Sequence, residues 1–316
     1  MGTAPTQDEM LSYFNSLSNW GRWGNEDDRG TLNHITRAKV SEAAAEVREG
    51  ISVGCARPIL REAPVSDVLI QPMRFMIATH EPPATERAGS LAPVPETASD
   101  FLMIASHGVT TTHVDTLSHF SREGKLYNGI PTSAVNTVSG ASRLGIESMK
   151  DGVVTRGVLL DIARLRGVRW MEAGDGVFPE DLEAAERAQG VRVEPGDALF
   201  IRTGWYQRRV EQGAYPERLH RPGFHAAALP WLQERRVALI AADASQDVGP
   251  SGYDALVQPV NAIGTVAMGL CIIDACNLEP LGETCERLGR ASFMFVLAPL
   301  NWPGGTASPA TPIALF

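Results

Sequence analysis

The stretch of sequence that decides the fold is FLMIASHGVTTTHVDTLSHFSREGKLYNG, residues 101–129. Its first five residues form an apolar run that predicts a buried strand. The polar residues that follow fall on odd positions from His107 to Asp115, so they would share one face if the strand continues. His113 and Asp115 would then lie about 7 Å apart at the backbone, close enough for both to bind one metal ion.

His119 follows Asp115 by four residues, and a helical turn there would return it to the same point. The pattern His-x-Asp-x-x-x-His therefore predicts a metal cluster where a strand meets a helix. The alternative is a set of ordinary hydrogen-bonded polar residues, because His-x-Asp alone also occurs by chance. Six residues of extended strand would hold His107 about 20 Å from His113. His107 could join the cluster only if the chain bends sharply at Gly108, so we expect it to have a structural or substrate-facing role.

The composition narrows the class of protein. The 316 residues carry 28 basic and 37 acidic side chains, a formal charge of −9, and no basic run longer than two, so nucleic acid is not an expected partner. No apolar run approaches the roughly 20 residues that cross a bilayer, and residues 1–11 do not resemble a secretory signal. Four cysteines without a CxxC pattern fit a reduced, cytoplasmic protein, in which we expect them to be buried apolar side chains.

The rest of the chain predicts one compact α/β domain over residues 1–316, in which helices and strands alternate irregularly. Thr36 is a candidate N-cap for a helix that Gly50 would end. Further helices are expected at 178–190 and 230–236. Strands are expected at 51–59, 157–165, 237–243 and 293–300, of which 293–300 would be the last strand of the chain. Two more strands, joined by a Pro-Gly turn, are expected within 191–205. Residues 82–99 are rich in Pro, Ala and Ser and predict a surface loop or lid.

Several blocks together resemble the cyclase family of metal-dependent hydrolases, the group that includes kynurenine formamidase and isatin hydrolase. The run VTTTHVDTLSH (109–119) is similar to the family signature His-x-Gly-Thr-His-x-Asp-x-Pro-x-His. The further matching blocks are WGNEDDRGTLN (23–33), GKLYNG (124–129), DVGPSG (247–252), PVNAIGTVAMGLCIIDACNLEPL (259–281) and PGGTASPATPIAL (303–315). The resemblance therefore extends over nearly the whole chain.

This resemblance implies a central mixed β core flanked by helices, of the swivelling β/β/α type, and a homodimer or larger assembly. It implies hydrolysis of an amide, lactam or lactone of a small cyclic or aromatic compound by a metal-activated water. His113 and Asp115 match ligands of the first ion, His119 matches a second ligand or a proton-transfer base, and Asp274 matches a later acidic position. We therefore expect His113, Asp115 and His119 to be catalytic, with the pKa of His119 near neutrality.

Two departures from the family pattern limit the expected metal site. Val109 occupies the position of the first ligand histidine, and Asn261 that of a later histidine. We therefore expect one ion, Zn or Mn, held by His113, Asp115, His119 and Asp274, and no site for two ions. The substrate-binding candidates are Tyr127, Trp23, His107 and Asn261.

Two alternatives remain open at this stage, since Val109 and Asn261 also fit a chain that has lost its metal. One is a metal-free cyclase or lyase that uses His113, Asp115 and His119 as acid–base groups. The other is a non-catalytic relative that binds a small molecule. The sequence does not identify the small molecule in any of these readings.

Overall fold

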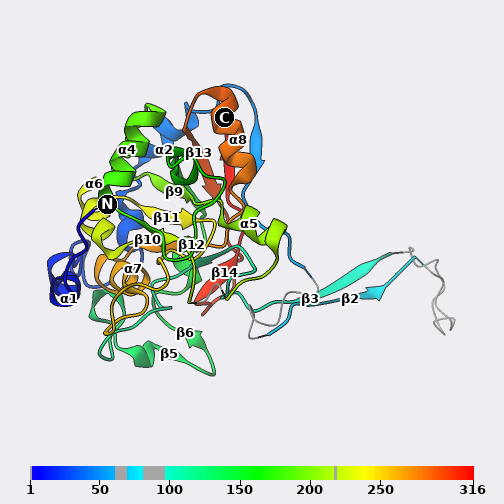
Figure 1. The fold of residues 1–316 in the computed structure, drawn as a ribbon. Helices are drawn as coiled ribbons and strands as arrows, with labels where there is room; N and C mark the ends of the chain where they lie inside the picture. Colours follow the sequence, from blue (N-terminus) through cyan, green and yellow to red (C-terminus); the bar gives the residue numbers. More distant parts are fainter. Residues whose placement is uncertain (1, 61–69, 81–96, 217–218) are drawn as a thin grey trace, which may run out of the picture.

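The computed structural model describes residues 2–60, 70–80, 97–216 and 219–316, and its centre is a nine-stranded mixed sheet (Figure 1). Its strands lie in the order β1 (Ser52–Gly54), β15 (Ile313–Leu315), β13 (Ser292–Leu297), β7 (Val153–Asp161), β9 (Ala198–Arg202), β11 (Leu239–Ala242), β12 (Cys271–Asp274), β4 (His113–Asp115) and β14 (Ala307–Pro309). The four strands from β7 to β12 are parallel, and the strands outside them pair antiparallel.

The central strands are buried on both faces, because their successive side chains enter two different hydrophobic cores. Leu160 of β7 and Ile240 of β11 pack in one core together with side chains of the helices α1, α4, α6 and α7. Leu159 and Ala241, their neighbours in sequence, pack in the other core, which also receives side chains of α8. This alternation explains why the strands read as continuous apolar runs. The expected α/β fold with a mixed β core flanked by helices is confirmed.

The helices are α1 (Gln7–Ser16), α2 (Arg37–Ala44), α3 (Ile162–Leu165), α4 (Pro179–Gln189), α5 (Trp205–Gln212), α6 (Leu229–Arg235), α7 (Pro259–Ile263) and α8 (Glu279–Leu288). The helices expected at 178–190 and 230–236 are confirmed as α4 and α6, and Gly190 ends α4 in the left-handed conformation. Thr36 caps α2 as expected, but α2 ends at Ala44. After Ala44 the chain continues in tight turns, in which the N–H groups of Glu46 and Val47 donate to the carbonyls three residues before them.

Three strand predictions needed correction. Of the two strands expected in 191–205, only β9 forms. The backbone N–H groups before it bind side chains instead of a partner strand: Val193 N–H donates to Glu186, and Glu194 N–H donates to Asp197. The strand expected at 157–165 is β7, which ends at Asp161, where that carboxylate caps α3. The strand at 293–300 is β13 and is not the last, since β14 and β15 follow it. Among the described residues, no helix is both long and apolar enough to cross a membrane.

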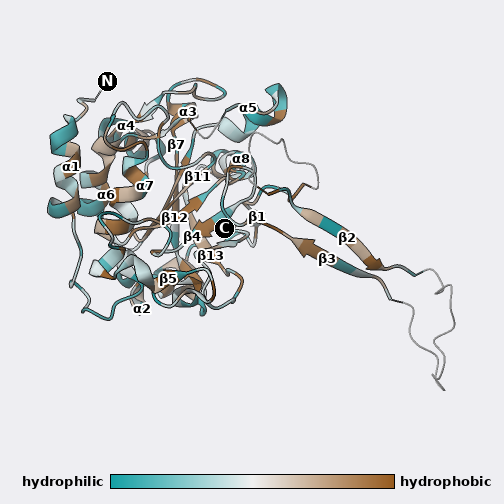
Figure 2. Ribbon diagram, turned by 90° about the horizontal axis from the view of Figure 1, so that it is seen from below, coloured by the Kyte–Doolittle hydropathy of each residue, from teal (hydrophilic) through white to brown (hydrophobic). Residues whose placement is uncertain are grey.

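The largest difference from expectation is in the stretch that opens the sequence analysis. Phe101 lies not in a buried strand but in β3 (Ser99–Met103), which pairs antiparallel with β2 (Met73–Ala78). The two strands form an arm that extends away from the body (Figures 1 and 2), and all their side chains are exposed. Of the loop expected at 82–99, residues 82–96 lie outside the described residues, and Ser99 begins β3.

Candidate metal centre

The centre is built on the short strand β4, which lies between β12 and β14. His113 and Asp115 are two residues apart on this strand, so their side chains point to the same face. In the antiparallel register His113 lies directly opposite Asp274, the last residue of β12. All three side chains are buried. Sheet pairing therefore brings a residue from the C-terminal part of the chain to the His-x-Asp pair.

Two groups of three metal-ligating side chains share Asp115. One consists of His107, Asp115 and His119, and the other of His113, Asp115 and Asp274. Asp115 Oδ1 lies 3.0 Å from His107 Nδ1 and 3.4 Å from His113 Nε2, and its Oδ2 lies 3.8 Å from His119 Nε2. In each group the ligand atoms lie within 4.8 Å of one another. The expected ligands are therefore joined by His107, which forms a second group with Asp115 and His119, and the number of ions bound stays a prediction.

His107 reaches the cluster because the strand does not continue from β3 to β4. Residues 106–111 are bends, and Gly108 has φ of 134°, a conformation that other residues rarely adopt. The imidazole of His107 then lies against Asp115, and its Nε2 is 2.9 Å from Thr306 Oγ1. The sharp bend that the sequence analysis named as the one way for His107 to join is thus the observed conformation.

Arg57 stabilises this bent loop through hydrogen bonds to its residues. Its guanidinium group donates to the backbone carbonyls of Val109, Asp243 and Cys276. The backbone N–H of Arg57 donates to Thr112 Oγ1 at 2.8 Å. Val109, which the resemblance places at the position of a family ligand, contributes a carbonyl to a buried arginine.

His119 follows β4 in a turn, in which its N–H donates to the Thr116 carbonyl. This turn places the imidazole over His107, and the two rings stack with centroids 3.7 Å apart. His107 and His119 are 34% and 30% exposed, whereas His113 is only 2% exposed. The cluster therefore has a buried side formed by His113 and Asp274 and a solvent-facing side formed by the two stacked imidazoles.

Asp274 is oriented by a second buried side chain. Gln246 Nε2 donates to Asp274 Oδ1 at 2.8 Å and to the Ile273 carbonyl at 2.9 Å. Gln246 is fully buried, so it holds one oxygen of the carboxylate in a fixed direction. The arrangement matches the outer-shell hydrogen bonds that orient metal-ligating carboxylates in proteins.

Asn261 lies at the start of α7, next to a buried carboxylate. Asp247 accepts the N–H groups of Val260 and Asn261 at 2.6 and 2.9 Å. The side-chain oxygen of Asn261 is buried and accepts no hydrogen bond from the described residues. Burial raises the pKa of Asp247 to about 7, against the lowering effect of Arg221 and the two N–H donors.

The electrostatics favour an ionised Asp115 carboxylate beside a neutral His119 imidazole. Burial by itself would raise the pKa of Asp115, but His113, His107 and His119 outweigh it and hold that pKa below its usual range. Burial lowers the pKa of His119 to about 4 although Asp115 opposes this, so the expectation of a value near neutrality needs correction. Burial, reinforced by Asp115, raises the pKa of Asp274. Neutral imidazoles beside an ionised carboxylate are the protonation states that bind a cation.

The donor atoms fit a metal ion. Asp115 Oδ1 and His107 Nδ1 are buried, and neither makes a well-aligned hydrogen bond within the described part of the chain. His113 Nδ1 lies 2.8 Å from the Thr111 carbonyl, and a proton donated there leaves Nε2 with its lone pair toward Asp115. Nitrogen and oxygen donors without thiolate suit Zn or Mn. Each of the four cysteines is buried, and burial raises the pKa of Cys271, the one on β12, to about 12.

The aromatic residues proposed from the sequence make contacts with residues outside the cluster. Tyr127 is fully buried; its hydroxyl donates to Asp27 at 3.1 Å, and its ring packs against Gly269. Trp23 packs edge-to-face on His34. These contacts are structural, and the role in substrate binding stays a prediction for both residues, as it does for Asn261.

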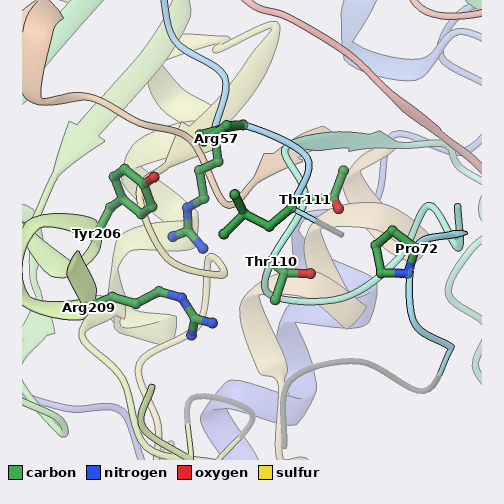
Figure 3. A pocket seen from close by; sticks show the side chains of 8 residues that line it. Arg57, Pro72, Thr110, Thr111, Tyr206 and Arg209 are labelled. Carbon is green, nitrogen blue, oxygen red and sulfur yellow. The ribbon is translucent and has the colours of Figure 1, made fainter. Parts of the chain in front are cut away.

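A small pocket shares the loop that carries the cluster. Figure 3 shows Arg57, Tyr206 and Arg209 on one side of it and Thr110 and Thr111 on the other. The Arg57 guanidinium stacks on the Tyr206 ring at 4.6 Å. Because Thr111 also accepts the hydrogen bond of His113, the lining of this pocket is connected to the cluster through one backbone segment.

Sequence reasoning did not find Gln246, Arg57 or Thr306. Gln246 follows the buried strand β11 in the run DASQDVG, and polar residues directly after a parallel strand are a usual signal for a site. No local pattern marks Arg57 or Thr306, because their partners are 52 and 199 residues away in the chain.

Comparison with known proteins identifies related chains. Residues 33–246, more than half of the 316, match the Cyclase family. A crystal structure of a novel cyclase is 32% identical in sequence, covers 96% of this chain and 99% of its own, and has a TM-score of 0.83. No curated protein sequence matches the chain.

More distant structures share the fold. Isatin hydrolase A from Labrenzia aggregata, bound to benzyl benzoate, is 18% identical over 90% of this chain and all of its own, with a TM-score of 0.58. Isatin hydrolase A from Ralstonia solanacearum is 20% identical over 88% of this chain and 95% of its own, with a TM-score of 0.57. The match to the family and the 32% identical structure together establish that this chain belongs to the Cyclase family.

Proposed function

We propose that this chain is a metal-dependent hydrolase that opens an amide, lactam or lactone bond in a small cyclic or aromatic compound. The observation that carries the proposal is the pair of buried carboxylates, Asp115 and Asp274, in one cluster with three histidines. Among the described residues, neither carboxylate lies within ion-pair distance of a Lys or Arg, and only Arg221 acts on Asp274 from farther away. Two buried carboxylates in contact are costly unless a cation compensates them, so a divalent ion is the group that the cluster fits.

The buried group formed by His113, Asp115 and Asp274 would hold the ion, Zn or Mn. A divalent ion at that place lowers the pKa of water toward ~7 and polarises a carbonyl group. Asp115 also faces His107 and His119, and these three side chains would form a second group for a cation on the solvent-facing side. Gln246 keeps Asp274 in its orientation.

His119 is the proposed proton-transfer group. Its low pKa keeps the imidazole neutral at physiological pH, so its Nε2 can accept a proton from water and return it to the leaving group. The 30% exposure of its side chain leaves it accessible to a substrate, and stacking on His107 fixes the plane of the ring. His107 is fixed in turn by Thr306.

The substrate class follows from the proposed chemistry and from the fold that this chain shares with isatin hydrolases. Isatin, a cyclic amide, is therefore the first compound to test, followed by other lactams, by lactones and by N-acyl aromatic amines. The pocket beside Tyr206 and Thr110 is the proposed subsite for the part of the compound that does not react.

A second candidate is acid–base catalysis without a metal. It is favoured by one observation, the 3.0 Å approach of His107 Nδ1 to Asp115 Oδ1, which resembles an imidazole held by a carboxylate. In that reading His119 would move protons in a cyclisation or elimination. Chelation should abolish turnover if the first candidate is right and should leave turnover intact if the second is right.

The test is elemental analysis of protein purified without a chelator or a nickel column, combined with turnover of the compound panel. We expect at least one equivalent of Zn or Mn per chain, and loss of both metal and turnover in His113→Ala. His225, which lies outside the cluster and stacks on Phe178, provides the matched control, and His225→Ala should keep its metal.

Turnover that survives complete removal of metal would replace the first candidate by the second. Metal-replete protein without turnover of any lactam, lactone or amide would contradict the proposed reaction while leaving the metal centre in place.

A further inference from the structure

The pocket beside the cluster brings two cationic side chains together. Among the described residues that line it, Arg57 and Arg209 carry charge and none is acidic. Figure 3 shows both guanidinium groups lying between Tyr206 and Thr110. Two like charges that share a small space repel each other, and an anion between them removes that repulsion. The charge of the pocket therefore favours an anionic group.

Arg57 is fixed in the wall of this pocket. Its guanidinium group donates to the backbone carbonyls of Val109, Asp243 and Cys276. Carbonyls carry no net charge, so these bonds orient the guanidinium group without neutralising it. The group also lies 4.6 Å from the centre of the Tyr206 ring, which packs against it. The fold thus sets the position of one positive charge before any ligand arrives.

Hydroxyl groups complete the polar part of the lining. Tyr206 and Arg209 are three residues apart on α5, so their side chains lie on the same face of the helix. Thr110 lines the pocket from the loop before β4. Within the described part of the chain, the hydroxyls of Tyr206 and Thr110 make no hydrogen bond. An anion in the pocket can accept hydrogen bonds from these hydroxyls as well as from a guanidinium group.

The size of the pocket limits which anion it can hold. Its free volume is about 40 Å³, and the rest of its lining is Pro58, Leu60 and Pro72. A single water molecule needs roughly 10–15 Å³ of free volume, so the pocket takes a few non-hydrogen atoms, as in a carboxylate. Sites that enclose a whole small molecule measure about 300–1,000 Å³. The pocket therefore fits one substituent of a larger compound.

The pocket lies close to the cluster because both are built on one segment of the chain. Thr111 lines the pocket, and its carbonyl lies 2.8 Å from His113 Nδ1. Two residues of chain span at most about 7 Å, so the backbone positions of Thr111 and His113 are no farther apart than that. One aromatic ring with a short substituent can bridge such a distance.

We propose that the substrate carries a carboxylate, separate from the bond that reacts, and that this pocket binds it. The inference rests on the proposed hydrolase function, because it names the substrate class of that same site. Arg209 contacts the carboxylate and sets the preference for it, while Arg57 supplies a fixed positive charge. Binding at this remote group positions the reacting carbonyl at the cluster.

The test compares 3- and 4-formamidobenzoate with their neutral isosteres, the formamidobenzamides, on the metal-loaded full chain. We expect kcat/KM for the better carboxylate to exceed that of its isostere about 10- to 100-fold, as for a hydrogen bond to a charged group. In Arg209→Gln this ratio should fall to within about threefold of one. Arg187→Gln is the matched control, because the Arg187 side chain is 72% exposed on α4, and it should keep the ratio.

Two further measurements serve if Arg209→Gln does not fold. On the unaltered chain, KM for the carboxylate should rise with added NaCl while KM for the neutral isostere stays constant, because salt screens charge. Tyr206→Phe removes one hydroxyl from the lining and should lower the ratio about 2- to 10-fold.

Benzoate, which the enzyme cannot hydrolyse, separates binding from catalysis. In titration calorimetry we expect benzoate to bind more tightly than benzamide, to bind about 10-fold more weakly to Arg209→Gln, and to bind still after chelation of the metal. Benzoate binding that chelation abolishes and Arg209→Gln leaves unchanged would place the carboxylate on the metal and overturn the proposal.

A kcat/KM ratio near one in the unaltered chain, or a ratio that Arg209→Gln does not change, would also overturn it. Turnover of the neutral amides in that case leaves the hydrolase function standing. Benzoate bound through Arg209 by a protein that hydrolyses none of the amides would support the anion pocket and contradict the hydrolase function. The two proposals can therefore fail separately.

Discussion

His107 Nδ1 lies 3.0 Å from Asp115 Oδ1, although an extended chain would place the two residues far apart. The contact exists because the loop between them bends at Gly108 and is held by Arg57. It changes the chemistry of the site, since it turns a cluster with two histidines into one with three. The loop and its supports are therefore the most informative places to perturb.

Replacing Arg57 by methionine should release the loop. Three backbone carbonyls would lose a charged donor, so we expect a loss of about 2–4 kcal/mol in the free energy of unfolding, together with weaker metal binding. Urea denaturation and metal titration measure the two effects. Arg187→Met is the control, because the Arg187 side chain is 72% exposed, and it should change stability by less than about 0.5 kcal/mol. Unchanged metal affinity in Arg57→Met would contradict the proposed role of the loop.

Removing Gln246 should weaken metal binding without removing a ligand. In Gln246→Met the Asp274 carboxylate loses its side-chain donor, and we expect metal affinity to fall about 10- to 100-fold. Competition with a chromogenic chelator gives this number. Gln189→Met is a control of the same chemistry, since Gln189 bonds only the backbone of Leu159 and Asp161 in the described structure. It should alter stability but leave the metal affinity as it is.

Chelation should destabilise the protein. A ligand that binds only the folded state at a thousandfold excess over its Kd contributes about 4 kcal/mol, so Tm should drop when the metal is removed and recover when Zn or Mn is added back. Differential scanning calorimetry checks this. The same treatment of His113→Ala should produce no further drop. Equal Tm values for treated and untreated wild type would argue against a bound ion.

The stability of the chelated protein should fall with rising pH because of Asp247. Its folded pKa of about 7 lies above the ordinary value of 3.8, so between these values the folded state binds the extra proton. The contribution is present in full below pH ~4 and is lost as the pH rises through 7, at up to about 1.4 kcal/mol per pH unit. Urea denaturation of wild type and Asp247→Asn at several pH values should show a flatter dependence in the variant. Parallel curves would refute the assignment, and Asp8→Asn, at an exposed site on α1, should give such parallel curves.

Local sequence signals were sufficient where a contact depends on neighbours in the chain. The expected approach of Asp115 and His119 is found at 3.8 Å, although the chain between them forms a turn and not the helix that was expected there. Helix α4 likewise begins at Pro179 and ends before Gly190, as the pattern predicts. Such features follow from backbone geometry that a few residues impose on themselves.

The arm shows where local signals were not sufficient. The run 101–105 has the composition of a buried strand, but residues 101–103 lie in the exposed strand β3. Composition does not tell which strand pairs with this one, and among the described residues β3 pairs with β2 and not with the nine-stranded sheet.

The sequence by itself determined the cyclase-family identity, the α/β class and the central His-x-Asp-x-x-x-His cluster, because these depend on residue types and on short spacings. Only the tertiary structure decided that His107 belongs to the cluster and that Gln246 orients Asp274. Each of these depends on contacts between residues distant in the chain: Arg57 with Val109, and β12 paired with β4. Contacts of that kind form when the whole sheet assembles, and no short stretch of the chain encodes them alone.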